Sequence, residues 1–278
     1  MKYELIDSGD FKKLEAFGEY RFMRPSASAV WEKSLSESEW SKVDATFNRD
    51  RSGDGEWKVL NKKLPDQWDI EVSNLKFRMR LTSFGHTGIF PEQADNWTWL
   101  QDKVRKGSKV LNMFAYTGGS TLACAKAGAE VVHLDASKTS VTWARENADL
   151  NDLSESKIRW IVDDVQEFVA KEIRRGNQYQ GFILDPPSYG RGTKKQVWKI
   201  EKHLTPLLRN LRKLAADDFQ FCLLSSHSQG YTPKAHANQL EQVFSDFKGT
   251  ELTSSEMFLE GRSSLKLPAG GYALIHRD

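Results

Sequence analysis

From about residue 92 onward, short apolar runs typical of strands alternate with longer stretches of helical periodicity. This alternation predicts a parallel sheet with helices on both faces, because a parallel strand pair needs a crossover that packs on the sheet. The expected strands are residues 109–114, 130–135, 158–162, 181–185, 218–225, 251–257 and 271–276. The expected helices are residues 93–105, 119–127, 138–151, 165–174, 195–214 and 234–247. The last two strands have no helix between them, so residues 260–271 are expected to form a long hairpin loop.

The first 90 residues lack long helical periodicity and contain short alternating runs instead. Trp68–Val72 and Phe77–Leu81 each place their apolar residues on one face of a strand, and Ser73-Asn74 between them suits a turn. Large apolar side chains for a separate small core come from Trp31, Trp40, Trp57 and Trp68. We therefore expect a β-rich accessory domain over residues 1–90 and the α/β domain over residues 91–278.

The composition is that of an ordinary globular protein, with 39% hydrophobic and 28% charged residues. No apolar run approaches the roughly 20 residues that span a bilayer, and charge interrupts the N-terminal residues too early for a secretory signal. Both Cys124 and Cys222 lie among apolar neighbours, as core cysteines do. We expect a soluble cytoplasmic protein with no membrane association, no disulfide framework and no metal site.

Residues 110–121 read as a strand, a glycine turn and the start of a helix. In open α/β sheets ligands bind at such a strand end, where glycine lets a cofactor approach the backbone and the helix offers free N–H groups. A purely structural turn explains this segment equally well by itself. The candidate cofactor contacts here are Phe114, Thr117 and Gly118.

Acidic residues follow the next two expected strands. Asp135 comes 17 residues after Gly118, near the spacing at which a carboxylate accepts hydrogen bonds from both hydroxyls of a ribose. After the third strand Asp164, preferred to Asp163, can accept a bond from an adenine amino group, although a helix N-cap is at least as good a local explanation. The order of turn, first acid and second acid in one sheet favours a nucleotide-like cofactor.

The fourth expected strand ends in Asp185-Pro186-Pro187. Two prolines stop the strand ladder and hold the backbone extended, which presents rigid carbonyls beside a carboxylate. Asp185 and the Pro186 carbonyl can accept hydrogen bonds from a base amino group, while Tyr189 is near enough to stack on the ring. We take Asp185, Pro186 and Tyr189 as catalytic candidates, in preference to a plain loop that ends a strand.

Together these segments resemble a known family, the class I S-adenosylmethionine (SAM)-dependent methyltransferases related to the large-subunit ribosomal-RNA cytosine-C5 and guanine-N7 enzymes. The resemblance covers roughly residues 80–278 and is most specific in the glycine turn and the Asp-Pro-Pro motif. It implies a Rossmann-like seven-stranded sheet, SAM as cofactor and RNA as substrate. The stretch that matches the approach to the SAM pocket makes Phe90 and Gln93 further candidate cofactor contacts. Residues 1–80 look unlike the PUA domain of many relatives. The segments concerned are 86–93, 112–119, 134–137, 163–165 and 185–189.

One departure from the family bears on the chemistry. Cytosine-C5 enzymes need a thiolate that adds to the ring, and relatives carry it in the loop after strand five, where this chain has Ser228. Cys222 lies inside the strand, where apolar surroundings raise a thiol's pKa and suppress its reactivity. Transfer to a base nitrogen needs no covalent enzyme intermediate and is the expected reaction. His227 in this loop can act as a base, but an ordinary exposed or hydrogen-bonding loop histidine is the preferred interpretation.

A basic run follows the Asp-Pro-Pro motif and contains a single acid, Glu201. Beside an active site it can hold an RNA backbone, and the resemblance favours that interpretation. The solvated face of a helix is almost as good an explanation, since a leucine stripe runs through the same segment. The basic residues are Arg191, Lys194, Lys195, Lys199, Lys202, Arg209, Arg212 and Lys213.

Two other function classes fit the same pattern less well. An NAD-dependent oxidoreductase is disfavoured because the glycine turn lacks G-x-G-x-x-G, because such an enzyme has no use for Asp-Pro-Pro, and because its sheet has six parallel strands without a terminal antiparallel hairpin. A non-catalytic RNA-binding module with the same fold is disfavoured because all three cofactor features are retained.

Overall fold

The computed structural model describes residues 2–49, 55–192, 196–262 and 265–277. The chain divides into two compact units. The N-terminal unit consists of Met1–Ala94 and Phe258–Ala269, and the sheet unit consists of Asp95–Met257 and Gly270–Asp278. A segment from near the end of the chain thus completes the N-terminal unit, whereas the sequence pattern grouped that segment with the large sheet.

The sheet unit is built on seven strands in the order β10-β9-β8-β11-β14-β16-β15. Strand β8 pairs in parallel with β9 and with β11, so the chain order reverses between β8 and β11, the place where open α/β sheets bind ligands. Strand β16 runs antiparallel to β14. The Rossmann-like seven-stranded fold expected from the sequence is confirmed. The strands are β8 (Lys109–Met113), β9 (Glu130–Asp135), β10 (Ile158–Val162), β11 (Gly181–Leu184), β14 (Phe221–Ser226), β15 (Glu251–Glu260) and β16 (Lys266–His276).

Several boundaries differ from the prediction. The expected helix from residue 195 begins only at Ile200, because a short hairpin precedes it. The fifth long strand begins at Phe221 and not at 218. The expected hairpin loop of residues 260–271 is much shorter, since β15 continues to Glu260 and β16 already begins at Lys266.

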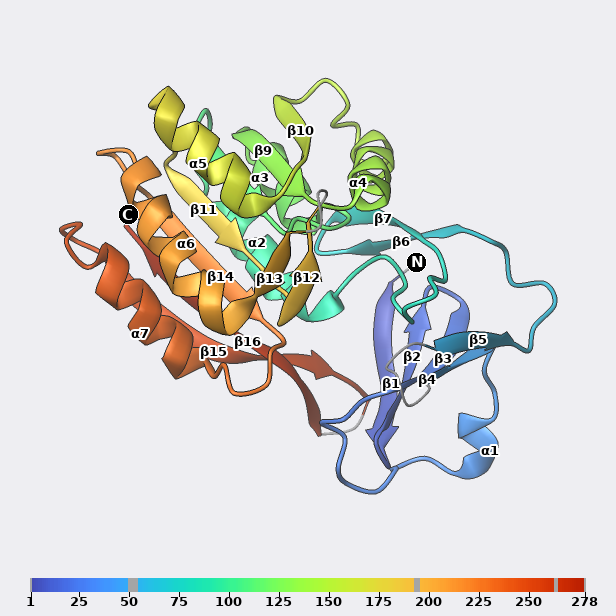
Figure 1. Cartoon of the computed structure of the whole chain (residues 1–278). Coiled ribbons are helices and arrows are strands. Elements are labelled where there is room, and N and C mark those ends of the chain that lie inside the picture. The colour runs from blue at the N-terminus through green and yellow to red at the C-terminus, as the bar shows by residue number, and fades with distance from the viewer. Residues whose placement is uncertain (1, 50–54, 193–195, 263–264, 278) are drawn as a thin grey trace. The chain divides into compact units, whose positions relative to one another are not determined.

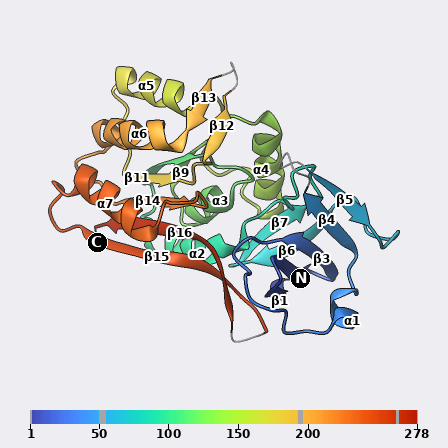
Figure 2. The same ribbon diagram turned by 60° about the horizontal axis from the view of Figure 1, so that its bottom comes forward.

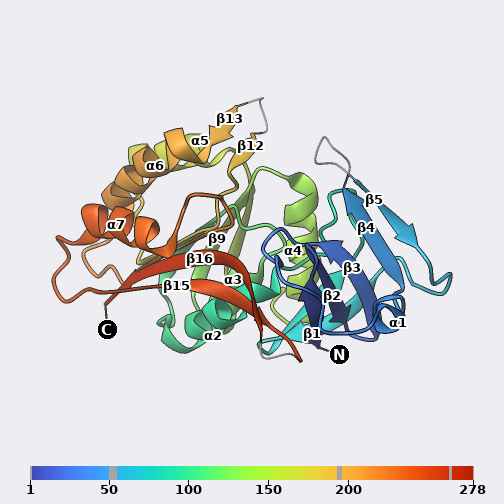
Figure 3. The ribbon, with the colours of Figure 1, turned by 90° about the horizontal axis from the view of Figure 1, so that it is seen from below.

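Helices cover both faces of the sheet, as Figures 1 and 3 show. On one face α5, α6 and α7 lie side by side, and on the other α3 and α4 pack against β9. Figure 2, a rotated view of the same ribbon, shows these two helix layers on either side of the sheet. The helices are α2 (Ala94–Lys103), α3 (Gly119–Lys126), α4 (Lys138–Leu150), α5 (Val165–Arg175), α6 (Ile200–Leu214) and α7 (Pro233–Phe244).

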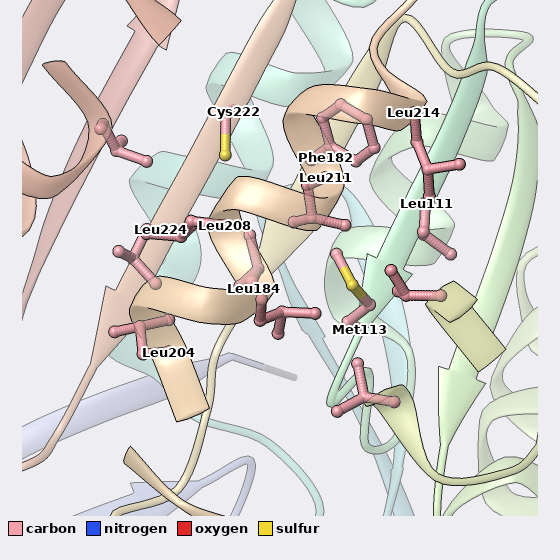
Figure 4. Close-up of a cluster of buried hydrophobic side chains, with 14 of the residues drawn as sticks. Leu111, Met113, Phe182, Leu184, Leu204, Leu208, Leu211, Leu214, Cys222 and Leu224 are labelled. Carbon is pink, nitrogen blue, oxygen red and sulfur yellow. The ribbon is translucent and has the colours of Figure 1, made fainter. Parts of the chain in front are cut away.

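The main core lies between α6 and the central strands (Figure 4). Every second residue of β8, β11 and β14 points to this face, as the period of a strand requires, and the leucine stripe of α6 packs on them. This buried stripe fixes the position of α6 on the sheet face. The side chains labelled in Figure 4 are Leu111, Met113, Phe182, Leu184, Leu204, Leu208, Leu211, Leu214, Cys222 and Leu224.

The N-terminal unit contains a five-stranded sheet in the order β1-β2-β3-β4-β5 and a separate hairpin of β6 and β7. Ser73 and Asn74 join β6 to β7 with positive φ angles of 51° and 60°, the conformation of a two-residue hairpin turn, so the predicted turn is confirmed. The elements are β1 (Tyr3–Gly9), β2 (Lys12–Phe17), β3 (Tyr20–Pro25), α1 (Glu37–Trp40), β4 (Ala45–Arg49), β5 (Gly55–Val59), β6 (Trp68–Val72), β7 (Leu75–Met79) and the 3-10 helix η1 (Pro91–Gln93).

The end of the β15–β16 hairpin belongs to the core of this unit. Leu259 and Leu267 are buried there against Leu5 and Ala29, and Arg262 forms an ion pair with Glu4 at 2.6 Å. The N-terminal unit therefore depends on a segment far away in sequence. Across the described residues no helix has both the length and the apolar character needed to cross a membrane.

Candidate active site

The glycine turn after β8 is tightly folded. Phe114, Tyr116 and Gly118 have positive φ angles of 54°, 48° and 94°. The Ala115 N–H donates to the Leu134 carbonyl at 3.2 Å, which ties the turn to the end of β9. Left-handed backbone at non-glycine residues is uncommon and concentrates at functional sites. This turn is the part of the sheet edge where a cofactor can lie against backbone.

Gly118 is required both by its φ angle and by the space around it. A Cβ on Gly118 would lie 3.1 Å from the Cβ of Ala144 on α4, which is tighter than ordinary van der Waals contact. The neighbouring Thr117 is buried, and its carbonyl accepts a hydrogen bond from Asn147 Nδ2 at 2.9 Å. Helix α4 thus holds the turn from one side.

A buried polar network lies beside the glycine turn and supports it. This network was not predicted from the sequence. Asn112 Nδ2 donates to Thr121 Oγ1 at 2.8 Å, and that oxygen lies 2.9 Å from His133 Nδ1. Burial lowers the pKa of His133 to about 3, so this ring is neutral at physiological pH. The network joins β8, β9 and the first turn of α3, which fixes where the helix N-terminus lies.

Asp135 links the end of β9 to the glycine turn. Its Oδ2 accepts from the Tyr116 N–H at 2.9 Å and its Oδ1 from the Ser137 N–H at 2.8 Å. Burial raises the pKa of Asp135, while the two N–H donors oppose this rise. Each carboxylate oxygen accepts two hydrogen bonds, so one acceptor position per oxygen is left for a ribose hydroxyl.

Asp164 caps helix α5, which was the local explanation left open by the sequence. Its Oδ1 accepts from the N–H groups of Gln166 at 3.0 Å and Glu167 at 3.1 Å. A Cβ on Gly192 would lie 2.8 Å from Asp164 Oδ2, so the backbone of the next hairpin passes close to that oxygen. The contact of Asp164 with an adenine ring stays a prediction. Asp163 is ion-paired with Lys171 at 2.6 Å.

Phe90 and Gln93 lie in the N-terminal unit, at the two ends of the short helix η1. The ring of Phe90 meets His86 edge-on at a centroid distance of 5.2 Å. Gln93 is buried, and its backbone N–H donates to the Phe90 carbonyl at 3.1 Å. Their contacts with a cofactor stay predictions.

The Asp-Pro-Pro motif directly follows β11 and is held by a hairpin that the sequence did not predict. This hairpin consists of β12 (Tyr189–Arg191) and β13 (Val197–Lys199). Trp198 Nε1 donates to the Pro187 carbonyl at 2.7 Å, and its ring lies 4.8 Å from that of Phe114. Trp198 therefore connects the motif to the glycine turn. The Pro187 carbonyl therefore already accepts a hydrogen bond from within the protein.

Tyr189 is half exposed, with 50% of its surface accessible. Its hydroxyl accepts a hydrogen bond of 3.4 Å from Arg191 Nε. A tyrosine that is anchored at its hydroxyl and open at its ring suits stacking on a planar base. The tyrosine lies within four residues of Asp185, as the sequence requires.

His227 lies beside Asp185, with 3.7 Å between His227 Nδ1 and Asp185 Oδ1. The sequence favoured an ordinary loop histidine, because nothing in the local pattern indicates that β11 and β14 bring the two residues together. Next to it Ser226 Oγ lies 2.7 Å from His236 Nε2. Burial lowers the pKa of His236, although Gln239 and Asp185 oppose the shift. The loop after β14 therefore presents an imidazole to the motif.

The two residues that bear on carbon methylation have different environments. Cys222 is fully buried in β14, opposite Phe182 of β11, and burial raises the pKa of its thiol well above the ordinary range. Ser228 is half-buried in the loop, where its carbonyl accepts from the Tyr231 N–H at 3.1 Å. A buried neutral thiol cannot attack a base, which agrees with the expectation that Cys222 is not a nucleophile.

The basic run divides into distinct groups. Lys194 and Lys195 lie outside the described residues. Arg212 pairs with Asp246 at 3.0 Å through Nε and lies 4.1 Å from the ring centroid of Phe247, so an internal contact already uses this charge. The leucine stripe of α6 is buried, as predicted. Exposed positive charges remain at Arg191, Lys202, Arg209 and Lys213.

The antiparallel strand β16 between β14 and β15 is the arrangement of the class I methyltransferase sheet and not that of the parallel dehydrogenase sheet. Comparisons with known proteins agree. A family model described as S-adenosylmethionine-dependent methyltransferase matches residues 38–220, more than half of the chain. The crystal structure of a SAM-dependent methyltransferase from Agrobacterium tumefaciens is 33% identical, covers 100% of this chain and 91% of its own, and superimposes with a TM-score of 0.94. The chain belongs to the SAM-dependent methyltransferase family.

Curated relatives match over shorter stretches. Ribosomal RNA large subunit methyltransferase K/L of Shewanella frigidimarina is 33% identical over 146 residues, which cover 52% of this chain and 20% of the relative. Ribosomal RNA large subunit methyltransferase I of Aeromonas salmonicida is 35% identical over 121 residues, which cover 43% of this chain and 30% of the relative. The matches span about a fifth to a third of the length of these two relatives.

SAM is the cofactor of this family, and the residues at the sheet edge fit it. Gly118 leaves the backbone of the turn open, Asp135 keeps acceptor positions for a ribose diol, and the first turn of α3 offers backbone N–H groups. When bound, SAM supplies a methyl group already activated by its sulfonium. The protein's own task is then to bind and align the acceptor.

Proposed function

We propose that this protein transfers the methyl group of SAM to a base nitrogen of RNA. The single observation that carries the proposal is the juxtaposition of Asp185 and His227, 3.7 Å apart, at the end of β11, beside the predicted SAM site. In that position a carboxylate and an imidazole meet the acceptor from two neighbouring strands. No reactive thiol is needed for this chemistry.

Asp185 and the Pro186 carbonyl would hold the base by accepting hydrogen bonds from its amino or ring N–H groups. Tyr189 would stack on the ring and fix its plane. Such alignment is the main requirement of the reaction, because the methyl donor is already activated. The three catalytic candidates thus have binding and orienting roles.

His227 would receive the proton that leaves the acceptor nitrogen, and Asp185 would orient its ring and favour the charged imidazolium. The N–H bond breaks as the N–CH₃ bond forms, and the proton passes to an imidazole nitrogen and then to water. This role goes beyond the loop histidine expected from the sequence. Geometry alone favours it, since the two side chains come from different strands.

RNA is the proposed substrate because the curated relatives bear the names of ribosomal RNA methyltransferases. The exposed charges of the basic run add support, since Arg191 is only two residues from Tyr189. Salt-sensitive RNA binding would follow from such contacts. Cytoplasmic localisation is part of the same proposal.

The test is transfer of a radiolabelled methyl group from SAM to total RNA lacking native modifications. The wild type should label RNA, and Asp185→Ala should reduce the rate by about 100-fold or more while SAM binding by calorimetry is retained. Asp149→Ala removes an exposed carboxylate of α4 and should label RNA at the wild-type rate. Label that enters protein or small molecules but never RNA would exclude the substrate class, and full activity of Asp185→Ala would remove Asp185 from the site.

A further inference from the structure

The N-terminal unit contains a buried cluster of charges that the proposed reaction does not use. Glu15 of β2 is fully buried, and both of its oxygens accept from the Arg24 guanidinium, at 2.8 Å and 3.0 Å. Lys13 Nζ lies 3.0 Å from Glu15 Oε1, and the Tyr3 hydroxyl donates to the same oxygen at 2.9 Å. Burial by itself raises the pKa of Glu15, but Arg24 and Lys13 outweigh that effect and hold it at about 2.

The cluster forms one side of a pocket of about 140 Å³ that lies wholly in the N-terminal unit. Arg49, at the end of β4, adds a third cation to the wall, and this side chain is exposed. The acids are Glu15 behind the wall and Glu92 in it. Among the residues that the structure describes, three cations and two carboxylates lie at this pocket, which leaves an excess of one positive charge.

Aromatic rings complete the pocket. Phe47 of β4 and the edge-on pair His86 and Phe90 line it. Gly85 holds this loop in place, because its carbonyl accepts from Arg24 Nη1 at 3.0 Å and a Cβ there would lie 2.5 Å from the Phe47 ring. The φ angle of Gly85 is +76°, which also favours glycine. The pocket is thus preformed around the guanidinium of Arg24.

A buried ion cluster gives a fold little net stability compared with apolar side chains in the same place, because desolvation offsets most of the attraction, although removing one member of the cluster is costly. Placed behind a small open pocket, it supplies fixed cations whose geometry is already determined. Preorganised cations beside aromatic rings are the chemistry that binds a nucleotide of single-stranded RNA, with phosphate on the cations and a ring on the aromatic side.

We propose that this pocket of the N-terminal unit binds a phosphodiester group of the RNA substrate, with Arg49 at its entrance and Arg24 and Lys13 in its wall. The inference rests on the proposed function, since it assumes that the substrate is RNA. It gives the accessory unit a direct role in substrate binding. Arg49 is the residue to change, because it is exposed and lies outside the buried cluster.

The experiment measures binding of a fluorescein-labelled single-stranded RNA of mixed sequence to the full chain, without SAM, over a series of salt concentrations. Arg49→Ala should weaken binding about 5- to 10-fold at low salt and reduce the slope of log affinity against log salt by about 0.7. Arg49→Lys should recover part of the affinity. The matched control is Lys62→Ala, an exposed cation of the same unit outside the pocket, which should change affinity less than twofold.

The outcomes separate this inference from the proposed function. If the wild type binds and methylates RNA while Arg49→Ala binds as tightly as Lys62→Ala, the pocket assignment is wrong and the reaction stands. If Arg49→Ala binds RNA normally but loses affinity for SAM in calorimetry, the pocket serves the cofactor and the inference is overturned. If inorganic phosphate at millimolar concentration binds the wild type but RNA does not, the pocket is a free-anion site and the inference is overturned, while the methyl-transfer assay decides the proposed function separately.

Discussion

At the scale of single residues, Asp135 combines a structural and a predicted binding role. It receives two backbone N–H groups that fix the glycine turn, and it keeps acceptor capacity for the cofactor. The sequence identified the residue from its position after a strand. Its bond to Tyr116 was not predictable, because that bond depends on the left-handed backbone of the turn.

Asp135→Asn should lower SAM affinity by about 10- to 100-fold, because the amide loses the charge and one acceptor and leaves a hydroxyl of the ribose poorly paired. Calorimetric titration with SAM measures the change. Asp149→Asn, an exposed acid on α4, should bind SAM as the wild type does. Equal affinity of Asp135→Asn and the wild type would remove Asp135 from the cofactor site.

Glu15 predicts a specific dependence of stability on pH. Its pKa is lowered from 4.5 to about 2 in the folded protein, so its contribution is fully present above the unfolded value and is lost as the pH falls from about 4.5 towards 2. The whole contribution is on the order of 3 kcal/mol. Glu15→Gln should therefore be less stable at neutral pH and lose less stability on acidification.

Urea unfolding of the wild type and Glu15→Gln at about pH 5.5 and pH 3.5 tests this prediction. The wild type should lose about 1 kcal/mol more than the variant over this interval. Parallel losses in the two proteins would show that Glu15 is not held ionised by Arg24 and Lys13.

At the scale of elements, the sequence predicted the parts whose pattern is local. Strands β9 and β10 were predicted residue for residue, since each is a short, mostly apolar segment with an acidic residue at or just after its end. The hairpin of β12 and β13 was assigned partly to helix α6, because its three-residue strands are too short for a period to emerge. That hairpin supplies Trp198, which no local signal connects to the active site.

Trp198→Phe should slow methyl transfer several-fold without weakening SAM binding, since phenylalanine keeps most of the ring contact with Phe114 but cannot donate to the Pro187 carbonyl. Steady-state kinetics at saturating SAM, together with calorimetry, would separate the two effects. As a control, Trp99→Phe changes a tryptophan that packs against Phe221 and His276. An unchanged turnover number in Trp198→Phe would show that the motif keeps its position without this bond.

At the scale of the whole molecule, the N-terminal unit is not one continuous stretch of the chain. The N-terminal unit recruits Phe258–Ala269 from the last hairpin. Sequence patterns could predict both strands of that hairpin. They could not predict that the end of the hairpin packs against β1, since Leu5 and Leu259 are 254 positions apart. The same limit hid the contact between Asp185 and His227. Long-range pairing, and not local propensity, determines such contacts.

Leu267→Ala should destabilise the N-terminal unit by about 2–5 kcal/mol, because it opens a cavity beside Leu5 and Ala29. Leu265→Ala, two residues earlier and 44% exposed, should cost less than about 1 kcal/mol. Thermal or urea unfolding of both variants gives the comparison. Equal effects would mean that the end of the hairpin is not part of the unit's core.

Methylation of an RNA base nitrogen without an active thiol can be tested on the reaction product itself. The most direct measurement is mass spectrometry of nucleosides from unmodified ribosomal RNA after incubation with the wild type, Asp185→Ala or His227→Ala, using SAM with a deuterated methyl group. We predict one N-methylated nucleoside, strongly reduced in both variants. A deuterated 5-methylcytidine, or no labelled nucleoside at all, would contradict this prediction.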